Sequence, residues 1–171
     1  MNIKYLILTA ISGAIITIDQ LTKMYVHTHF SLGESMTVIE KFFNLTYVRN
    51  NGAAFGIFGE SHPLFREIFF LSMPPIAVLV ILTILRGVAE RDRVNIVALS
   101  LIFGGAIGNY IDRLRFRYVI DFLDFHLAGQ YTWPAFNVAD MGIVCGVAAL
   151  IFLEFSRKTP PEKQTAKQAN T

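Results

Sequence analysis

The feature that most limits the possible folds of this chain is a set of four apolar stretches. Each is close to the roughly 20 residues that an α-helix needs to cross a bilayer. They run over about residues 5–26, 68–86, 94–112 and 135–155. Charged residues make up only 16% of the chain, against about 25% in soluble domains. We therefore predict an integral membrane protein, mainly α-helical, with four transmembrane helices in a single domain of residues 1–171.

Between the first two spans lies a segment whose composition is typical of strands. Residues 37–48 are rich in β-branched and aromatic side chains, and Asn50-Asn51-Gly52 is a turn signal. We predict a small extracytoplasmic β-element over about residues 35–58. The polar tail, about residues 158–171, is expected to be disordered.

Four spans place both termini on one side of the membrane, and the Lys and Arg counts barely decide which side. The tails and the short loop Arg86–Arg93 hold 8 of the 15 basic residues, and the other segments hold 7. Cytoplasmic loops carry the excess of basic residues. Because the 8 are concentrated in short segments, we predict that both termini are cytoplasmic and that the two larger loops lie outside.

Two charged residues interrupt the first apolar stretch. Asp19 and Lys23 are four residues apart, so they lie on one helix face and can form an ion pair. One interpretation is a self-neutralising pair whose lysine reaches the membrane surface. The other is that the pair contributes to a functional site, and spacing alone leaves both open.

A second polar cluster lies where the third apolar stretch ends. Asn109, Asp112 and Arg113 fall within about one helical turn of one another. Helix capping with an interfacial arginine would explain them alone. Polar side chains also occur at or beside the outer ends of the other spans, and such convergence at one depth indicates a site.

Two aspartates bracket the segment between the third and fourth spans. Asp121 lies in the extended-looking run Val119-Ile120-Asp121-Phe122, whose apolar neighbours would raise its pKa by desolvation. Asn137 is a suitable helix N-cap, which places Asp140 in the first turn of the fourth span, where the helix dipole favours the anion. Two nearby carboxyl groups cannot both ionise easily, so they would share a proton. One could then act as general base on a water while the other donates a hydrogen bond to a substrate carbonyl. An N-terminal-turn aspartate and an unrelated loop aspartate remain the alternative.

Other chemistries have weaker support in the sequence. His27 and His29 are two residues apart, which is wrong for one helix face, and no cysteine or clustered third histidine completes a metal site. Cys145 has no basic neighbour in sequence that would activate it. A net charge of +2 gives no reason to expect a nucleic-acid partner.

Five motifs together resemble one known family, lipoprotein signal peptidase, also called signal peptidase II. The resemblance extends over nearly the whole chain up to about Arg157. The motifs occur in the family's order: Asp19-Gln20-x-x-Lys23, Asn50-x-Gly52-Ala53-Ala54-Phe55, Gly104-Gly105-Ala106-x-Gly108-Asn109-x-x-Asp112-Arg113, Val119-Ile120-Asp121-Phe122 and Phe136-Asn137-Val138-Ala139-Asp140.

This resemblance implies an aspartic endopeptidase of the bacterial inner membrane that needs no cofactor or metal. It would cleave diacylglyceryl-modified prolipoproteins just before the lipidated cysteine, at the periplasmic face. Asp121 and Asp140 would be the catalytic pair. The residues that bind substrate or support the site would be Asp19, Lys23, Asn50, Gly52, Gly108, Asn109, Arg113 and Asn137.

The resemblance also implies partners and a fold. The partners would be the prolipoprotein, membrane lipids and cyclic peptide antibiotics such as globomycin, lodged between the two aspartates. The fold would be four transmembrane helices with a small extracytoplasmic β-element and a periplasmic helix or loop. Two other functions remain open from the residues alone. One is a small proton or ion carrier that uses Asp19, Asp121 and Asp140 as a relay, and the other is an assembly subunit whose buried polar groups only lock helix packing.

Overall fold

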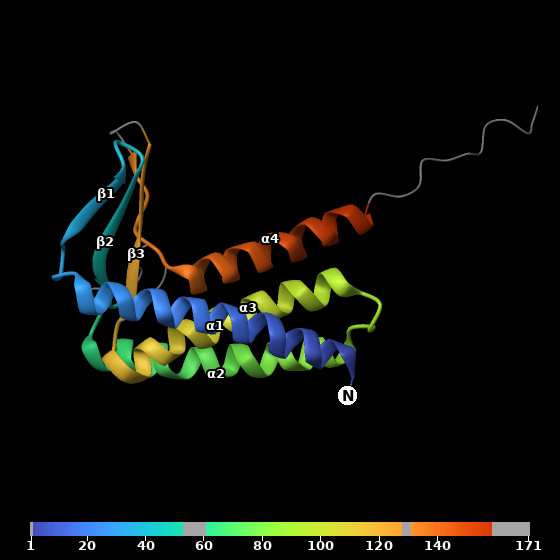
Figure 1. Ribbon diagram of the computed structural model, residues 1–171. Helices are drawn as coiled ribbons and strands as arrows, with labels where there is room; N and C mark the ends of the chain where they lie inside the picture. The colour runs from blue at the N-terminus through green and yellow to red at the C-terminus, as the bar shows by residue number, and fades with distance from the viewer. Residues whose placement is uncertain (1, 53–60, 128–130, 159–171) are drawn as a thin grey trace, which may run out of the picture.

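Four long helices form most of the described part of the chain, and Figure 1 shows how they are arranged. The computed structural model describes residues 2–52, 61–127 and 131–158. The helices are α1 (Ile3–His29), α2 (Pro63–Gly87), α3 (Arg93–Phe116) and α4 (Val138–Lys158). All four are long and apolar enough to cross a membrane. The predicted fold class, a mainly helical membrane protein with four spans, is therefore confirmed.

Several helix ends differ from the predicted ones by a few residues, and for two of them the structure shows a local reason. α2 begins at Pro63 rather than at residue 68, because proline suits the first helical position and the His62 side chain caps the helix. α3 continues to Phe116 rather than ending near residue 112. α4 begins at Val138 rather than at residue 135, because Asn137 caps its N-terminus through its Oδ1 atom, 2.9 Å from the Asp140 backbone nitrogen.

The helix α3 is the centre of the bundle and contacts each of the other three helices. Small residues make this possible. Gly104 packs against Ser12 and Ile15 of α1, and Gly105 lies directly against the Ala139 carbonyl oxygen of α4. Such contacts bring helix backbones close together in a membrane, where packing rather than the hydrophobic effect drives association.

Gly105→Ala is expected to lower the free energy of unfolding by roughly 1–3 kcal/mol, the usual cost of overpacking. The new Cβ would meet the Ala139 carbonyl oxygen, which is backbone, and the Ile143 Cγ1 atom at 2.7 Å. Gly13→Ala is the matched control, since a Cβ at Gly13 meets nothing within 4 Å. That variant should gain about 0.5–1 kcal/mol from helix propensity. Unfolding in mixed detergent micelles measures the free energy of unfolding of both variants. Equal changes in the two variants would contradict the close α3–α4 contact.

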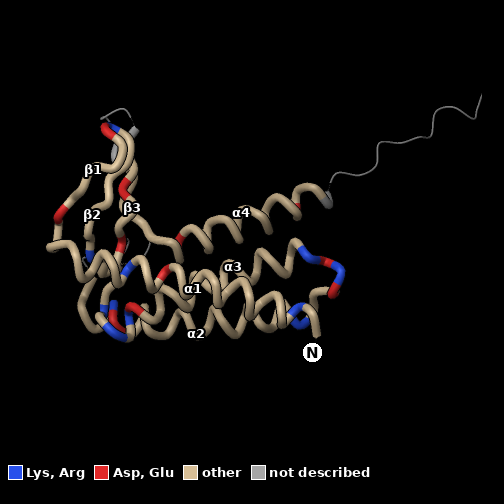
Figure 2. Tube along the Cα trace, in the orientation of Figure 1, with Lys and Arg blue, Asp and Glu red and all other residues tan. Residues whose placement is uncertain are grey.

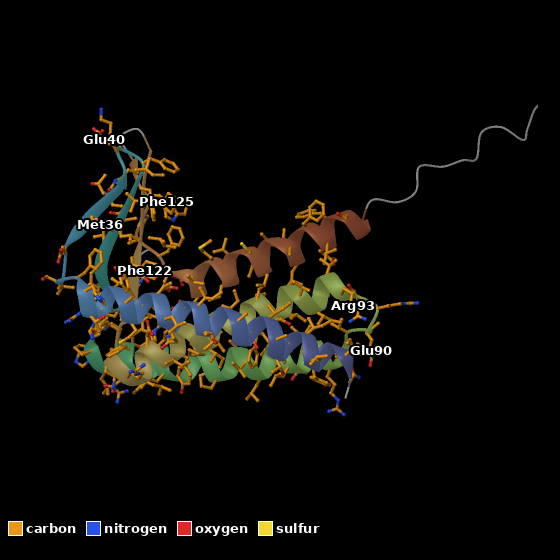
Figure 3. The ribbon with its side chains drawn as sticks, viewed as in Figure 1. Met36, Glu40, Glu90, Arg93, Phe122 and Phe125 are labelled. Carbon is orange, nitrogen blue, oxygen red and sulfur yellow. The ribbon has the colours of Figure 1, made fainter. Side chains whose placement is uncertain are left out.

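A small antiparallel sheet stands at one end of the helices. Its strands are β1 (Ser35–Ile39), β2 (Phe43–Asn50), β3 (Val119–Leu127) and β4 (Tyr131–Thr132), in the order β1-β2-β3-β4. Figure 3 shows Met36 and Phe122 on this sheet, and Glu90 and Arg93 at the opposite end of the molecule.

The sheet is larger than the predicted β-element of residues 35–58. β1 and β2 lie within that range, whereas β3 comes from the segment after the third span and pairs with β2 from Phe43↔Phe125 to Asn50↔Val119. The sequence marked only the start of β3 as extended, because aspartates at positions 121 and 124 break the apolar strand pattern. Residues 53–58 of the predicted element, with the motif residues Ala53-Ala54-Phe55, lie outside the described residues.

Apolar packing fixes the sheet on the helices. Val26 of α1, Tyr47 of β2, and Ile120 and Phe122 of β3 form one buried cluster. The Tyr47 hydroxyl also lies 2.6 Å from Nδ1 of His27 at the end of α1. The base of β3, which carries Asp121, is therefore held against the ends of α1 and α3.

Candidate active site

The aspartate on strand β3 is buried and held by two amide donors. The Asp121 side chain is 2% exposed. Its Oδ2 atom accepts a hydrogen bond from Asn50 Nδ2 at 3.0 Å, and its Oδ1 atom accepts one from Asn137 Nδ2 at 2.6 Å. Asn50 stands at the end of the neighbouring strand β2, so the sheet register itself sets one of these contacts.

Burial raises the pKa of Asp121 from 3.8 to about 7, and the negative charge of Asp140 adds to the increase. Hydrogen bonds from Asn50 and Asn137, and the positive charge of Lys23, oppose it. The desolvation expected from the apolar neighbours in sequence is thus confirmed. Near neutral pH this carboxyl group is divided between its protonated and ionised forms.

The second aspartate lies in the first turn of α4 and forms a reciprocal cap with Asn137. The Asp140 backbone nitrogen donates to Asn137 Oδ1 at 2.9 Å, and the Asn137 backbone nitrogen donates to Asp140 Oδ2 at 3.3 Å. This is the arrangement of a capping box, with aspartate in place of the usual Glu or Gln. Asn109 Nδ2 donates to Asp140 Oδ1 at 2.7 Å. Both carboxylate oxygens therefore accept hydrogen bonds at a helix N-terminus, where negative charge is stabilised.

Asn137 links the two aspartates directly. Its side-chain nitrogen donates to Asp121, while its backbone nitrogen donates to Asp140. The same side-chain nitrogen contacts Asn109 Oδ1 at 3.2 Å. Asn137 is fully buried, so these bonds are made without competition from bulk water. The electrostatic effect of Asp140 on Asp121 is a second sign that the two carboxyl groups lie near each other.

Behind this pair lies a buried charge cluster between α1 and α3. Lys23 Nζ is 2.8 Å from Asp19 Oδ2, 3.0 Å from Asp112 Oδ2 and 2.9 Å from Asn109 Oδ1. The Lys23 residue is 1% exposed and Asp19 is 0% exposed. The interpretation of a lysine that reaches the membrane surface is therefore wrong, because Asp112 and Asn109 of α3 hold it inside.

The charge cluster also reaches the two elements that carry the aspartate pair. Asp19 Oδ1 accepts a hydrogen bond from the Ala139 backbone nitrogen in the first turn of α4, at 2.9 Å. Asp112 Oδ2 accepts one from the Ile120 backbone nitrogen on β3, at 3.1 Å. Each cluster carboxylate thus fixes the residue immediately before one of the candidate catalytic aspartates.

Two residues in contact with this cluster, Asp112 and Gln20, lie outside the predicted set of site residues. In the sequence Asp112 is part of a helix-end cluster, and its spacing of one turn from Asn109 indicates a shared face. Gln20 lies in the motif that contains Asp19 and Lys23. Its Nε2 atom donates to Asp112 Oδ1 at 2.8 Å and contacts Asp19 Oδ2 and the Gly108 carbonyl oxygen, both at 3.2 Å. A single glutamine gives no signal in the sequence alone.

Gly108 matters because of the space it leaves. A Cβ at this position would lie 2.7 Å from Asp19 Oδ2 and 3.1 Å from the Ala139 Cβ. Only glycine lets the buried carboxylate and α4 approach α3 this closely. The close approach of Asp19 and Ala139 is a steric reason for glycine at position 108 of the predicted site.

Arg113, near the end of α3, contacts the segment that follows strand β2. Its Nη2 atom donates to the Gly52 carbonyl oxygen at 3.2 Å, and the Gly52 backbone nitrogen donates to Asn50 Oδ1 at 2.9 Å. The guanidinium also interacts electrostatically with Asp140 and Asp121. A cation near the two aspartates favours at least one negative charge between them.

The ten sequence-predicted site residues are brought together at the sheet end of the bundle. They are connected through the contacts described above: Asp19, Lys23, Asn50, Gly52, Gly108, Asn109, Arg113, Asp121, Asn137 and Asp140. Among the described residues, no group of three or more His, Cys, Asp or Glu side chains is arranged to hold a metal ion. One carboxyl group with a raised pKa and one hydrogen-bonded carboxylate can serve as general acid and general base.

Comparison with known proteins places the chain in a family. The family model for signal peptidase (SPase) II matches residues 11–156. The lipoprotein signal peptidase of Desulforapulum autotrophicum is 45% identical over 161 residues, covering 94% of this chain and 99% of that protein. The lipoprotein signal peptidase of Syntrophus aciditrophicus is 48% identical, covering 86% and 92%. A solved bacterial membrane enzyme superposes with a TM-score of 0.82 and 32% identity, covering 94% of both chains. The chain therefore belongs to the signal peptidase II family.

Proposed function

We propose that this chain removes the signal peptide from prolipoproteins that carry a diacylglyceryl group on cysteine. Cleavage falls just before the lipidated cysteine, by attack of a water that Asp121 and Asp140 activate. Membership of the signal peptidase II family supports a peptidase, and the names of its relatives support a prolipoprotein substrate. The observation that carries the mechanism is Asn137, which hydrogen-bonds both carboxyl groups from one buried position.

In the proposed reaction the two aspartates have opposite roles. Asp140 takes a proton from water as the water oxygen attacks the scissile carbonyl carbon, and protonated Asp121 donates its proton to the carbonyl oxygen. The tetrahedral intermediate then collapses: Asp140 returns a proton to the leaving nitrogen, and Asp121 recovers one from the hydroxyl group. The products are a peptide carboxylic acid and a free amine. The raised pKa of Asp121 supports its role as acid.

The supporting residues hold this arrangement in place. Asn109 orients Asp140 from α3, and Asn50 orients Asp121 from β2. Arg113 supplies a positive charge near both and fixes the Gly52 carbonyl. Such a rigid polar frame lets charge develop at the reacting carbonyl without reorganisation.

The position of the carboxylates in the bundle favours a peptidase over a proton or ion carrier. A relay needs ionisable groups at several depths across the bilayer. Asp19, Asp112, Asp121 and Asp140 are instead connected at the sheet end, through Lys23, Asn109 and Asn137. A lipidated signal peptide is itself a membrane helix, so an enzyme that cuts it must meet it at the membrane surface.

The decisive assay uses the purified full-length chain in lipid vesicles with a prolipoprotein in two forms. The form with a diacylglyceryl cysteine should be cleaved immediately before that cysteine, and the unmodified form should remain intact. Mass spectrometry of the released peptide locates the cut. Absence of cleavage of the modified form, or a cut elsewhere, would contradict the proposed reaction.

The pH dependence of cleavage should report on Asp121. Because protonated Asp121 is the acid, kcat/KM should fall as the pH rises through about 7, the pKa of that group. The Asn50 hydrogen bond lowers this pKa, so Asn50→Ala should move the alkaline limb to higher pH. Asn44→Ala is the control, since Asn44 lies on the same strand and contacts His126 instead. An unshifted limb in Asn50→Ala would contradict the role of Asp121 as acid.

We further propose that both termini are cytoplasmic and that the site faces the periplasm of a bacterial inner membrane. Basic residues in the α2–α3 loop support this orientation, and that loop lies at the end of the bundle opposite the sheet. A reporter fused at Thr171 tests this orientation, and a periplasmic signal would overturn it.

Globomycin is proposed to bind between Asp121 and Asp140. It should block cleavage competitively, and inhibition unaffected by substrate concentration would contradict that site.

A further inference from the structure

A side-chain amide of α1 lies between the two buried carboxylates of the charge cluster. Gln20 donates from its Nε2 atom to Asp112 Oδ1 at 2.8 Å and contacts Asp19 Oδ2 at 3.2 Å. The same nitrogen contacts the Gly108 carbonyl oxygen on α3, also at 3.2 Å. Figure 2 shows charged positions gathered at this end of the helices, near the sheet. Gln20 thus joins α1 to α3 through a group that carries no charge.

The hydrogen-bond donors of the cluster show why this amide is needed. A lysine ammonium has three N–H donors. Lys23 Nζ lies within hydrogen-bond distance of three oxygens, which account for all of them: Asp19 Oδ2, Asp112 Oδ2 and Asn109 Oδ1. Among the described residues, Gln20 is therefore the one donor to Asp112 Oδ1. The Asp112 residue is 1% exposed, and a buried carboxylate oxygen without a donor is costly. The orientation of the Asp112 side chain thus depends on Gln20.

The same two carboxylates hold the backbone beside the candidate catalytic pair. Asp112 Oδ2 accepts a hydrogen bond from the Ile120 backbone nitrogen at 3.1 Å, and Asp19 Oδ1 accepts one from the Ala139 backbone nitrogen at 2.9 Å. Ile120 directly precedes the candidate aspartate on β3, and Ala139 directly precedes the one on α4. A carboxylate is rigid, so a rotation that moves one of its oxygens moves the other as well. A change in the contacts of Gln20 would therefore reach both of these backbone amides.

We propose that Gln20 is a positioning residue, which fixes the two cluster carboxylates and through them the separation of Asp121 and Asp140. Its side chain makes no hydrogen bond to either aspartate of that pair, so it acts through the cluster. A neutral amide suits this position, because a carboxylate would repel the two acids and an apolar side chain would offer no donor. The proposal rests on the proposed peptidase reaction, since that reaction requires both aspartates at one water.

The first measurement is hydrogen exchange at single backbone amides, followed by NMR of the full-length protein in detergent micelles. In Gln20→Met, the Ile120 and Ala139 amides should exchange at least about tenfold faster, the effect expected when a hydrogen bond to a charged group is lost. The Phe122 amide is the internal reference, because it donates to the Phe136 carbonyl oxygen instead. It should exchange as in the wild type. Unchanged exchange at Ile120 and Ala139, or an equal increase at Phe122, would overturn the proposal.

The second measurement separates kcat from KM for cleavage of a diacylglyceryl-modified prolipoprotein. Gln20→Met should lower kcat about 10²-fold, the loss that a misplacement of about 1 Å can cause. KM should stay at the wild-type value, because the catalytic groups are displaced while substrate binding is kept. Thr22→Val is the matched control, since the Thr22 hydroxyl lies on the same turn of α1 and donates to carbonyl oxygens of α1 itself. Its kcat should match the wild type, and an equal kcat in Gln20→Met and Thr22→Val would contradict the positioning role.

A third variant and the wild type make the possible failures distinguishable. Gln20→Asn keeps the amide but is one methylene group shorter, so it should show the same faster exchange and lower kcat even if Gln20→Met does not fold. If the wild type does not cleave the modified prolipoprotein, the proposed peptidase reaction fails. If the wild type cleaves and the folded Gln20 variants have its kcat, the positioning role alone is wrong.

Discussion

Asp121→Asn and Asp140→Asn are each expected to slow signal peptide release at least about 10³-fold, within the range measured for lost acid–base groups. Asparagine keeps the size of the side chain but can neither accept the proton of the attacking water nor deliver one to the carbonyl oxygen. Because the two residues act as one unit, the double variant should be little slower than either single variant. Single-turnover cleavage of a diacylglyceryl-modified prolipoprotein measures all three rates.

Asp124→Asn is the matched control for this pair. Asp124 lies on the same strand as Asp121, but it contacts Thr46 and His126 on the sheet rather than the site. Its variant should cleave at nearly the wild-type rate. Melting temperatures check that every variant is folded. If either Asp121→Asn or Asp140→Asn is folded and cleaves at the rate of Asp124→Asn, the two residues are not the catalytic pair.

Lys23→Met is expected to cause the largest loss of stability, about 3–5 kcal/mol, which is typical when one partner of a buried ion pair is removed. The Lys23 ammonium lies between Asp19 and Asp112, and both carboxylates are buried. Without it they repel each other in a low-dielectric interior. Asn109 also loses the donor that contacts its Oδ1 atom, so cleavage should fall as well.

The control and a double variant separate this effect from simple loss of a lysine. Lys41→Met changes an exposed residue outside the bundle and should alter stability little. Lys23→Met combined with Asp112→Asn removes both charges of one pair and should recover part of the loss, so the two substitutions are not additive. Unfolding in mixed micelles gives the free energies. A loss in Lys23→Met no larger than in Lys41→Met would contradict the buried cluster.

The helices could be predicted from the sequence because each depends on a long local signal. Apolar stretches of span length identify all four, and their errors are confined to the ends. The cap at Asn137 could also be predicted, since an asparagine followed three residues later by an acid is a recognised start signal. This local pattern correctly placed Asp140 in the first turn of α4.

The sheet and the buried cluster depend on long-range contacts, and the sequence predicted them less well. β3 pairs with a strand about seventy residues earlier in the chain, as in Asn50↔Val119, and no local pattern announces that partner. The environment of Lys23 likewise depends on α3, which supplies Asp112 and Asn109. The spacing of Asp19 and Lys23 alone therefore could not show whether Lys23 reaches the membrane surface, and the packing of α1 against α3 shows that it does not.

In the proposed mechanism, Asp121 and Asp140 activate a water, and this water attacks the scissile carbonyl directly. A single turnover in water enriched in heavy oxygen tests it, with mass spectrometry of the released signal peptide and of the enzyme. The heavy oxygen is expected in the new carboxyl group of the peptide, with none in Asp121 or Asp140. Heavy oxygen in either aspartate would show that the carboxylate itself attacked the substrate and would contradict this mechanism.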